Sequence, residues 1–393
     1  MKLLTIGVTY GGGGPGATTK YVHEALIESG FESIVACAIC QSKDKGVETV
    51  YNKTDYYLYR LFRHFNKRCK IVSTIASYRI INLIRTKKPD LIHIRVIHHS
   101  FINHKILFKY LSKTNIPLVF TLHDMWLMTG GCYHFIDCNC NKYQNECDSC
   151  QKQGRLLDNA VKKVKSEFIF KREFIKNYDN VTIVAVSSWV KDCIEMSFLR
   201  NCRNVLIYNS IDTTVFYPRE RIEGEKYVVI GVANTWSKNK GIEDYIYLAK
   251  ILPKEYEIHL IGNVPEDYDL PENIICLGHI VSKDRIAELY SSADVYVSLS
   301  YQETFGMTIA EAACCGKITI GYNTSAIPEI IALAHGIVVK PGDVEKIRDE
   351  IINVCSNKLG LTDIQIKEIH HAFSKERLVS QHLELYKSLT NNQ

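Results

Sequence analysis

The sequence lacks any apolar run long enough to cross a membrane. A membrane-spanning helix needs about 18 or more residues with few or no charges, and no stretch of the 393 residues meets that requirement. Low-complexity tracts and internal repeats are also missing. Hydrophobic residues make up 46% of the chain and charged residues 23%, a balance that excludes a largely disordered protein. The length favours two or more domains.

The first residues do not have the pattern that is typical of a secretory signal. Lys2–Thr9 is too short for the apolar core of a signal peptide and runs directly into glycines. We therefore interpret it as a first β-strand and expect a cytoplasmic protein. In that compartment the 14 cysteines are expected as reduced thiols or metal ligands rather than as disulfides.

The charge is distributed unevenly along the chain. Residues 1–180 contain 27 basic and 15 acidic residues, whereas the remainder contains 21 basic and 28 acidic residues. The densest basic stretch, residues 51–120, has 14 basic and only 2 acidic residues. One-sided charge of this kind is typical of a surface that faces an anionic partner. Nucleic acid, an acidic membrane surface and phosphorylated substrates are all candidates at this point.

Apolar strand-like runs alternate with helical patterns over almost the whole chain, in two successive series. The expected strands are residues 2–9, 33–38, 90–97, 117–123 and 181–186 in the first series and 227–233, 257–261, 294–298, 318–321 and 337–340 in the second. Helices expected between them include residues 18–29, 78–87, 241–252 and 344–355. Nearly continuous Val, Ile and Leu runs are typical of strands buried on both faces, and their alternation with helices predicts doubly wound parallel sheets. The sequence thus predicts an α/β protein with two Rossmann-like domains facing across a cleft. The expected domains are residues 1–195, residues 196–373 and a C-terminal helix, residues 374–393, that packs back on the first domain.

Two features of the first domain suggest a ligand site. The first strand ends in a glycine-rich turn that includes Gly13 and Gly14, and such a turn lets an anion approach backbone amides at a helix N-terminus. It is neither a P-loop nor a dinucleotide fingerprint, and a simple tight turn remains an alternative. His123, at the end of a later strand, is placed to hydrogen-bond a substrate hydroxyl, unless it forms a capping pair with Asp124.

The most specific pattern lies in the second domain. Glu303 and Glu311 are eight positions apart, with a glycine turn between them and a helix expected from about Met307. Amides at that helix start can bind phosphate or sugar oxygens. Glu311, about one turn into the helix, can reach a ribose diol.

These motifs resemble those of the retaining glycosyltransferases of family 4, which have the GT-B fold. The resemblance extends over nearly the whole chain. Within the family, Trp126 followed by Gly130-Gly131-Cys132 and a cysteine cluster resembles bacterial polysaccharide-biosynthesis transferases. The residues that carry it are Glu303 to Glu311, Asn209-Ser210-Ile211-Asp212, Phe216-Tyr217-Pro218, Lys240-Gly241, His123-Asp124 and Ile327-Pro328-Glu329.

The resemblance implies a role for each matching residue. Lys240 contacts the donor pyrophosphate, Glu311 holds the ribose, and Glu303 holds the transferred sugar, so that no metal cofactor is required for catalysis. His123 hydrogen-bonds the same sugar. The implied donor-binding set is Gly13, Gly14, Asn209, Lys238, Phe305, Gly306, Met307 and Glu311. Lys238 stands where many relatives have an arginine, and Ser210 replaces a usual glycine.

A cysteine cluster follows His123. Cys132, Cys138, Cys140, Cys147 and Cys150 lie within 19 residues, and the last two form a Cys-x-x-Cys pair. We expect a structural zinc ion held by Cys132, Cys138, Cys147 and Cys150. A metal-free loop with reduced thiols is the alternative.

Residues 56–68 have an apolar helical face flanked by basic residues. This pattern is typical of an interfacial helix on anionic lipid, although an ordinary surface helix gives the same pattern.

The sequence therefore predicts a glycosyltransferase that moves a sugar from a nucleotide-sugar donor to a growing cell-surface polysaccharide or lipid-linked glycan, with retention of configuration. We expect it to be peripheral on the anionic inner face of the membrane and not to bind nucleic acid. The alternatives are a nucleotide-sugar epimerase of the same fold and a zinc-containing nucleic-acid-binding protein. The acidic second domain speaks against nucleic acid.

Overall fold

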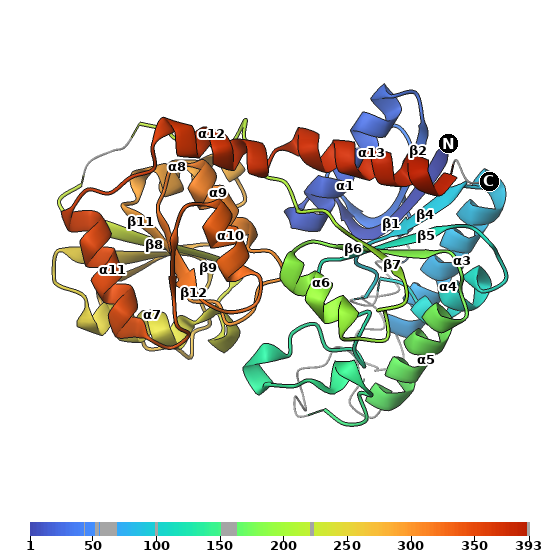
Figure 1. Cartoon of the computed structure of the whole chain (residues 1–393), viewed down its shortest axis with the longest axis horizontal. Coiled ribbons are helices and arrows are strands. Elements are labelled where there is room, and N and C mark those ends of the chain that lie inside the picture. Colours follow the sequence, from blue (N-terminus) through green and yellow to red (C-terminus); the bar gives the residue numbers. More distant parts are fainter. Residues whose placement is uncertain are drawn as a thin grey trace. The chain divides into compact units, whose positions relative to one another are not determined.

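The chain, seen here in a computed structural model, divides into two compact units (Figure 1). Unit 1 is Met1–Ile207 with Leu378–Gln393, and unit 2 is Tyr208–Arg377. The structure describes residues 1–42, 44–51, 55, 69–98, 101–150, 163–220 and 224–390, with only the backbone for 69–72.

Unit 1 is built on a seven-stranded parallel sheet in the order β3-β2-β1-β4-β5-β6-β7. Leu3, Leu91 and Val119 of its central strands are fully buried, as the continuous apolar runs predict. The strands are β1 (Lys2–Tyr10), β2 (Glu32–Cys40), β3 (Val47–Thr49), β4 (Leu91–Ile94), β5 (Leu118–Leu122), β6 (Val181–Ala185) and β7 (Arg203–Leu206). The helices are α1 (Gly13–Glu28), α3 (Cys69–Lys87), α4 (His104–Leu111), α5 (Val164–Lys176) and α6 (Ser188–Glu195).

Unit 2 is built on a six-stranded parallel sheet in the order β10-β9-β8-β11-β12-β13. The strands are β8 (Tyr227–Thr235), β9 (Tyr256–Asn263), β10 (Ile274–Gly278), β11 (Val295–Ser298), β12 (Thr319–Tyr322) and β13 (Ile337–Val339). The helices are α7 (Ile242–Ile251), α8 (Lys283–Ser292), α9 (Met307–Cys314), α10 (Ile327–Leu333), α11 (Val344–Ser356) and α12 (Asp363–Ala372). Two parallel α/β sheets confirm the predicted fold class.

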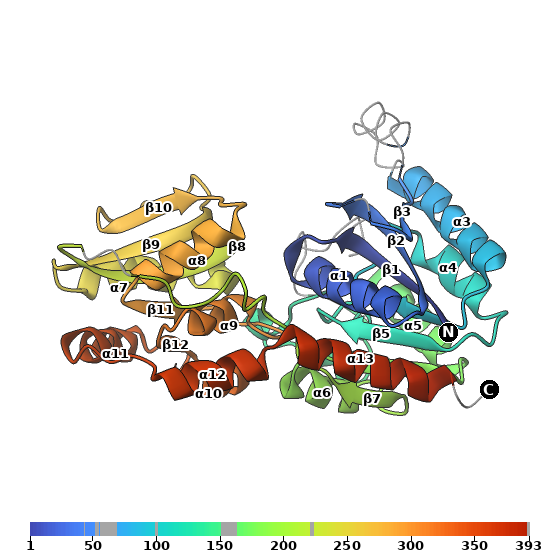
Figure 2. The same cartoon turned by 90° about the horizontal axis from the view of Figure 1, so that it is seen from above.

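The last helix, α13 (Lys375–Thr390), begins in unit 2 and continues along unit 1 (Figure 2). Leu378, Leu385 and Tyr386 are buried in one apolar cluster with Leu3 of β1 and Leu26 of α1. Burial of this apolar face holds the helix on unit 1. The predicted return of the C-terminal helix to the first domain is confirmed.

Several element boundaries differ from those that the sequence pattern predicts. Helix α1 begins at Gly13, within the glycine run, instead of at Thr18, and α3 begins at Cys69 instead of Tyr78. Glycines have low helix propensity, so the pattern placed the start of α1 too late. The edge strands β3, β7 and β10 were not expected, because they are short and carry few consecutive buried apolar residues.

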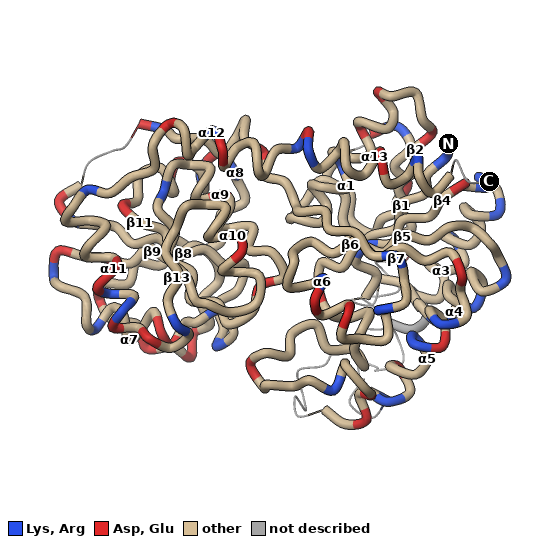
Figure 3. The backbone as a smooth tube through the Cα atoms, viewed as in Figure 1, with Lys and Arg blue, Asp and Glu red and all other residues tan. Residues whose placement is uncertain are grey.

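Among the described helices, none combines the length and the apolar character that crossing a bilayer requires. The predicted interfacial helix at residues 56–68 lies outside the described residues. Basic residues outnumber acidic ones in α3, α4 and α5 of unit 1, whereas acidic residues slightly outnumber basic ones in α7 and α11 of unit 2 (Figure 3). This distribution agrees with the charge asymmetry of the sequence.

The order of the strands marks one point in each sheet where a ligand is expected. In doubly wound sheets, ligands bind beyond the carboxyl ends of the strands where the strand order reverses. This point lies between β1 and β4 in unit 1 and between β8 and β11 in unit 2.

Candidate functional site

In unit 2, a lysine and a glutamate meet at the reversal point. Lys240 ends a single 3-10 turn after β8, and Glu303 follows β11. The ammonium group of Lys240 donates a hydrogen bond to Glu303 Oε1. The Glu303 amide in turn donates to the hydroxyl of Ser325 over 2.9 Å. The structure thus brings together two of the three residues predicted to be catalytic.

The turns that carry these residues depend on glycine. Gly241 has a φ of +74° and a Cβ there would lie 2.2 Å from the Leu299 carbonyl oxygen, so a side chain in this turn would displace the backbone directly after β11. Gly306 has a φ of +99° and precedes α9. The first turn of α9, beginning at Met307, therefore presents backbone amides without an acidic side chain among them, as binding of phosphate or sugar oxygens requires.

Glu311 lies in the second turn of α9. Its carboxylate accepts a 3.4 Å hydrogen bond from the Tyr290 hydroxyl. Burial raises the pKa of Glu311 to about 7, although Lys283 and Tyr290 oppose the shift. Glu303 and Glu311 both raise the pKa of Tyr296 in addition to its burial, so the two glutamates act on one region of unit 2.

The remaining predicted donor residues of unit 2 have different surroundings. Asn209 is 6% exposed and the Phe305 side chain is 1% exposed, so Phe305 offers a ligand only its backbone. Lys238 is 69% exposed and forms a 3.4 Å ion pair with Glu243. Lys238 thus pairs with a residue of α7, whereas Lys240 pairs with Glu303.

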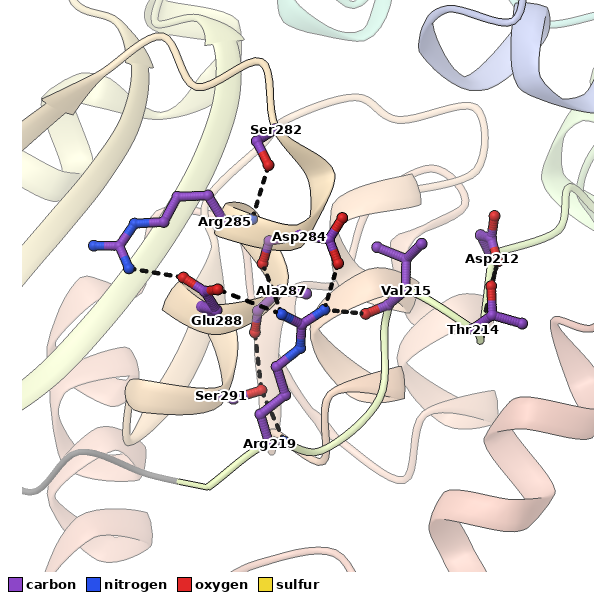
Figure 4. Close-up of polar contacts among 10 residues, drawn as sticks. All are labelled: Asp212, Thr214, Val215, Arg219, Ser282, Asp284, Arg285, Ala287, Glu288 and Ser291. Atoms are coloured by element: carbon purple, nitrogen blue, oxygen red, sulfur yellow. Dashed lines mark hydrogen bonds and ion pairs between the residues drawn. The ribbon is translucent and has the colours of Figure 1, made fainter.

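The segment that carries Asn209 is anchored to α8 (Figure 4). Arg219 Nη2 lies 3.0 Å from Asp284 Oδ1 and donates to the Val215 carbonyl oxygen over 2.9 Å. The Asp212 carboxylate accepts a 2.6 Å hydrogen bond from the Thr214 hydroxyl. These contacts hold the turn after Asn209 in place and give Asp212 a structural role.

In unit 1, the glycine run forms the entry to α1. The Gly11 amide donates to the Gly16 carbonyl oxygen over 3.0 Å. Gly13 has a φ of +62°, and it and Gly14 are the first residues of the helix. They are therefore part of the helix N-terminus, which still leaves amides for an anion.

His123 directly follows β5 and lies beside Arg95, which directly follows β4. The Arg95 Nη1 atom is 3.5 Å from His123 Nε2 and donates to the Thr18 hydroxyl over 2.6 Å. Burial and the neighbouring Arg95 lower the pKa of His123 to about 3, against the effect of Asp124. His123 is therefore neutral near pH 7 and suited to hydrogen bonding rather than to charge stabilisation.

Asp124 and Trp126 continue this site. Asp124 accepts a 2.9 Å hydrogen bond from the Trp126 amide and lies 3.1 Å from His98 Nε2. The buried Lys171 donates to the Trp126 carbonyl oxygen and lies 4.1 Å from the centre of its ring. The Asp124 carboxylate thus caps the loop through the Trp126 amide, whereas His123 faces Arg95.

The five clustered cysteines line one cavity of unit 1, together with Phe135 and Tyr143. Burial raises the pKa of the Cys147 thiol to about 11. Within the described ranges, no three His, Cys, Asp or Glu side chains are grouped closely enough to hold a metal ion. The thiols share a cavity, and zinc binding at Cys132, Cys138, Cys147 and Cys150 remains a prediction.

Arg95 and its neighbours were missed from the sequence. Residues 90–97 were interpreted as one continuous strand, but β4 ends at Ile94. An arginine inside a mostly apolar run is the signal that could have identified the site.

Two protein-family models match this chain, one over its N-terminal half and the other over most of the rest. A model of "Glycosyltransferase Family 4" matches residues 12–215. A model of "Glycosyl transferases group 1" matches residues 216–375.

Individual proteins agree with these matches. An N-acetyl-alpha-D-glucosaminyl L-malate synthase of Bacillus anthracis is 26% identical over 204 residues, which are 46% of this chain and about half, 52%, of that protein. WcaC of Escherichia coli strain K12, named for colanic acid biosynthesis, is 19% identical over 99% of this chain and 100% of its own.

Among solved structures, Anabaena HepE in complex with UDP-glucose has a TM-score of 0.65 at 15% identity, over 99% of this chain and 100% of that one. This likeness concerns the fold. The matches over both halves show that the chain belongs to glycosyltransferase family 4 and has the GT-B fold.

Proposed function

We propose that the protein transfers a sugar from a nucleotide-sugar donor to a glycan or lipid-linked acceptor in bacterial polysaccharide or glycolipid synthesis, with retention of anomeric configuration. The observation that carries the proposal is the Lys240–Glu303 pair at the reversal point of unit 2. The family assignment favours this transferase over the epimerase and nucleic-acid-binding alternatives.

The chemistry follows from the leaving group. Departure of a nucleoside diphosphate places negative charge on the pyrophosphate, which a preorganised cation and helix N-terminal amides stabilise. Lys240 supplies the cation, and the amides at the start of α9 lie one turn before Glu311. We assign the ribose hydroxyls to Glu311, the transferred sugar to Glu303, and a hydrogen bond from that sugar to neutral His123.

A donor panel tests this function. The purified protein is incubated with UDP-, GDP- and ADP-sugars, and release of nucleoside diphosphate is measured with and without glycan acceptors. We expect release from one nucleotide class, and a product whose anomeric proton coupling matches the donor's. A protein that binds none of the donors would reject the function. A product with inverted configuration would reject retention alone.

We further propose that the acceptor is lipid-linked and that unit 1 contacts the anionic inner leaflet. The basic stretch at residues 51–120 supports this proposal, since each basic residue near an anionic surface adds about 1 kcal/mol to binding. The protein should sediment with anionic vesicles and not with neutral ones, less so at high salt. Equal sedimentation of the wild type and an Arg60→Glu, Arg63→Glu variant would exclude residues 56–68 as the anchor.

A further inference from the structure

Unit 1 holds a buried cation that the proposed chemistry does not use. Arg95 is 6% exposed and directly follows β4 at the reversal point of the sheet. The glycine run after β1 occupies the other side of the same point. Arg95 therefore stands where doubly wound sheets place their ligand-binding groups.

The partners of Arg95 are neutral. Its Nη1 atom donates to the Thr18 hydroxyl over 2.6 Å, and its guanidinium also hydrogen-bonds the Tyr386 hydroxyl of α13. Its Nε atom is buried with no hydrogen-bond partner. The Pro15 carbonyl oxygen and His123 Nε2 each lie 3.5 Å from Nη1. All four groups around the guanidinium are therefore uncharged, and the Nε–H donor is unused.

No carboxylate compensates this charge within the part of the chain that the structure describes. Burial lowers the pKa of Arg95, and the group that opposes the shift is the Tyr386 phenol rather than an acid. Asp124, the acidic residue that lines the same pocket, is engaged by His98 and by the Trp126 amide. A buried charge without a counterion is costly, which a bound anion would remedy.

A pocket is present at the same place. Arg95, His98, His123, Asp124 and Trp126 line a space of about 300 Å³, which includes some open solvent, between the ends of β4 and β5. Because part of this space is open solvent, the enclosed part of the hollow is small. It suits a single small group rather than a whole nucleotide sugar.

We propose that Arg95 binds an anionic group, a phosphate or a carboxylate, in this pocket. A guanidinium matches both groups with parallel hydrogen bonds. That the group belongs to a substrate rests on the proposed function, and the two sources are the donor pyrophosphate and an acidic acceptor. The existence of the anion site itself does not depend on any transfer activity.

Indole NMR of the full chain tests the site without an assay of transfer. The protein has three tryptophans, so ¹⁵N-indole labelling gives three signals, and Trp126→Phe assigns the one in the pocket. Inorganic phosphate and glucuronate should shift the Trp126 signal to saturation, and neutral glucose should not. A Trp126 signal that neither anion moves in the wild type would overturn the proposal.

Two variants locate the cation. Arg95→Met should weaken phosphate binding at least tenfold, and Arg95→Lys, which keeps the charge without the planar fork, should have an intermediate affinity. The matched control is Arg203→Met, which removes the same charge from β7 of the same unit, where the side chain is exposed. It should bind phosphate as the wild type does.

The melting temperature separates ligand binding from a structural role. If Arg95 serves to bind a ligand, its buried charge does not stabilise the protein in the absence of that ligand. Without phosphate, Arg95→Met should therefore melt at or above the wild-type temperature. A lower melting temperature with unchanged phosphate affinity would make Arg95 a structural residue and overturn the proposal. If Arg95→Met does not fold, the wild-type titration and Arg95→Lys still decide.

A final titration identifies the source of the anion. Phosphate is titrated again in the presence of saturating UDP. Displacement of phosphate from the Trp126 site would assign the group to the donor pyrophosphate, and unchanged phosphate binding would assign it to the acceptor.

Discussion

The two units have the same sheet plan but place charge differently at the point where their strand order reverses. In unit 2 the cation, Lys240, follows the first of the two strands and is paired with Glu303 after the second. In unit 1 the cation, Arg95, follows the second strand and is held by hydroxyl groups, with the glycine run after the first. One cation is neutralised within the unliganded protein, and the other is not.

The difference indicates two ways of preparing a cationic site. A paired lysine is stabilised in the free protein, and it must exchange its carboxylate for the ligand, which then competes with Glu303. An unpaired buried guanidinium raises the energy of the free protein and gains most from an anion. We therefore expect removal of each cation to affect stability in opposite directions.

The largest effect is expected from Lys240→Met. Loss of one preorganised group that stabilises a leaving group costs about 10²–10³ in rate, so nucleoside diphosphate release should fall by that factor. Because Glu303 then loses its partner, the variant should also melt a few degrees lower, unlike Arg95→Met. Steady-state assays and thermal unfolding measure the two results.

The control for Lys240 is Lys226→Met, which breaks a 3.6 Å ion pair with Glu257 in the same unit. An exposed ion pair contributes only about 0.2–1 kcal/mol to stability, so turnover and melting temperature should stay close to the wild-type values. Comparable losses in the two variants would show that Lys240 acts through net charge and not through contact with the leaving group.

An effect of intermediate size is expected from changes to the cysteine cavity. Zinc binding there would change the charge balance of unit 1. If the thiols hold zinc, the purified protein should contain about one zinc ion per chain, and Cys147→Ser should lower both metal content and melting temperature. Metal analysis and thermal unfolding with a chelator measure this. Cys276→Ser, at an exposed position of unit 2, is the control. Metal-free protein of full stability would exclude zinc.

The sequence predicted the parts of the molecule that depend on local pattern. Continuous apolar runs predicted the central strands of both sheets, and the glycine before Met307 predicted the start of α9. The pairing of Lys240 with Glu303 required the fold, since the residues are 63 positions apart.

The contacts of Arg95 could not be predicted for the same reason. The Tyr386 hydroxyl, which it contacts, is also 2.7 Å from Nδ1 of His93, a residue 293 positions away along the chain. Only the return of α13 to unit 1 brings these residues together. Apolar periodicity places α13 as a helix, but it says nothing of which buried polar group its tyrosine meets.

The smallest expected effect concerns pH and Glu311. Burial raises the pKa of this carboxyl to about 7 in the unliganded protein, whereas a carboxylate that accepts two ribose hydroxyls must be ionised. At pH 6 the Glu311 carboxyl is protonated in most molecules and must lose its proton before the donor binds. At pH 8 it is already ionised in most molecules. Donor affinity should rise about tenfold between pH 6 and pH 8. Glu311→Gln should bind weakly and without this dependence.

The stability of the free protein should change in the opposite direction. Because the folded pKa of Glu311 lies above its unfolded value of about 4.5, its contribution is fully present below pH 4.5 and is lost as the pH rises through about 7. Glu255→Gln, at an exposed position of unit 2, should leave both profiles unchanged. Calorimetric titration with the donor and thermal unfolding over pH 5–8 measure them. Donor affinity that is constant from pH 6 to 8 would show that Glu311 does not hold the ribose as a carboxylate.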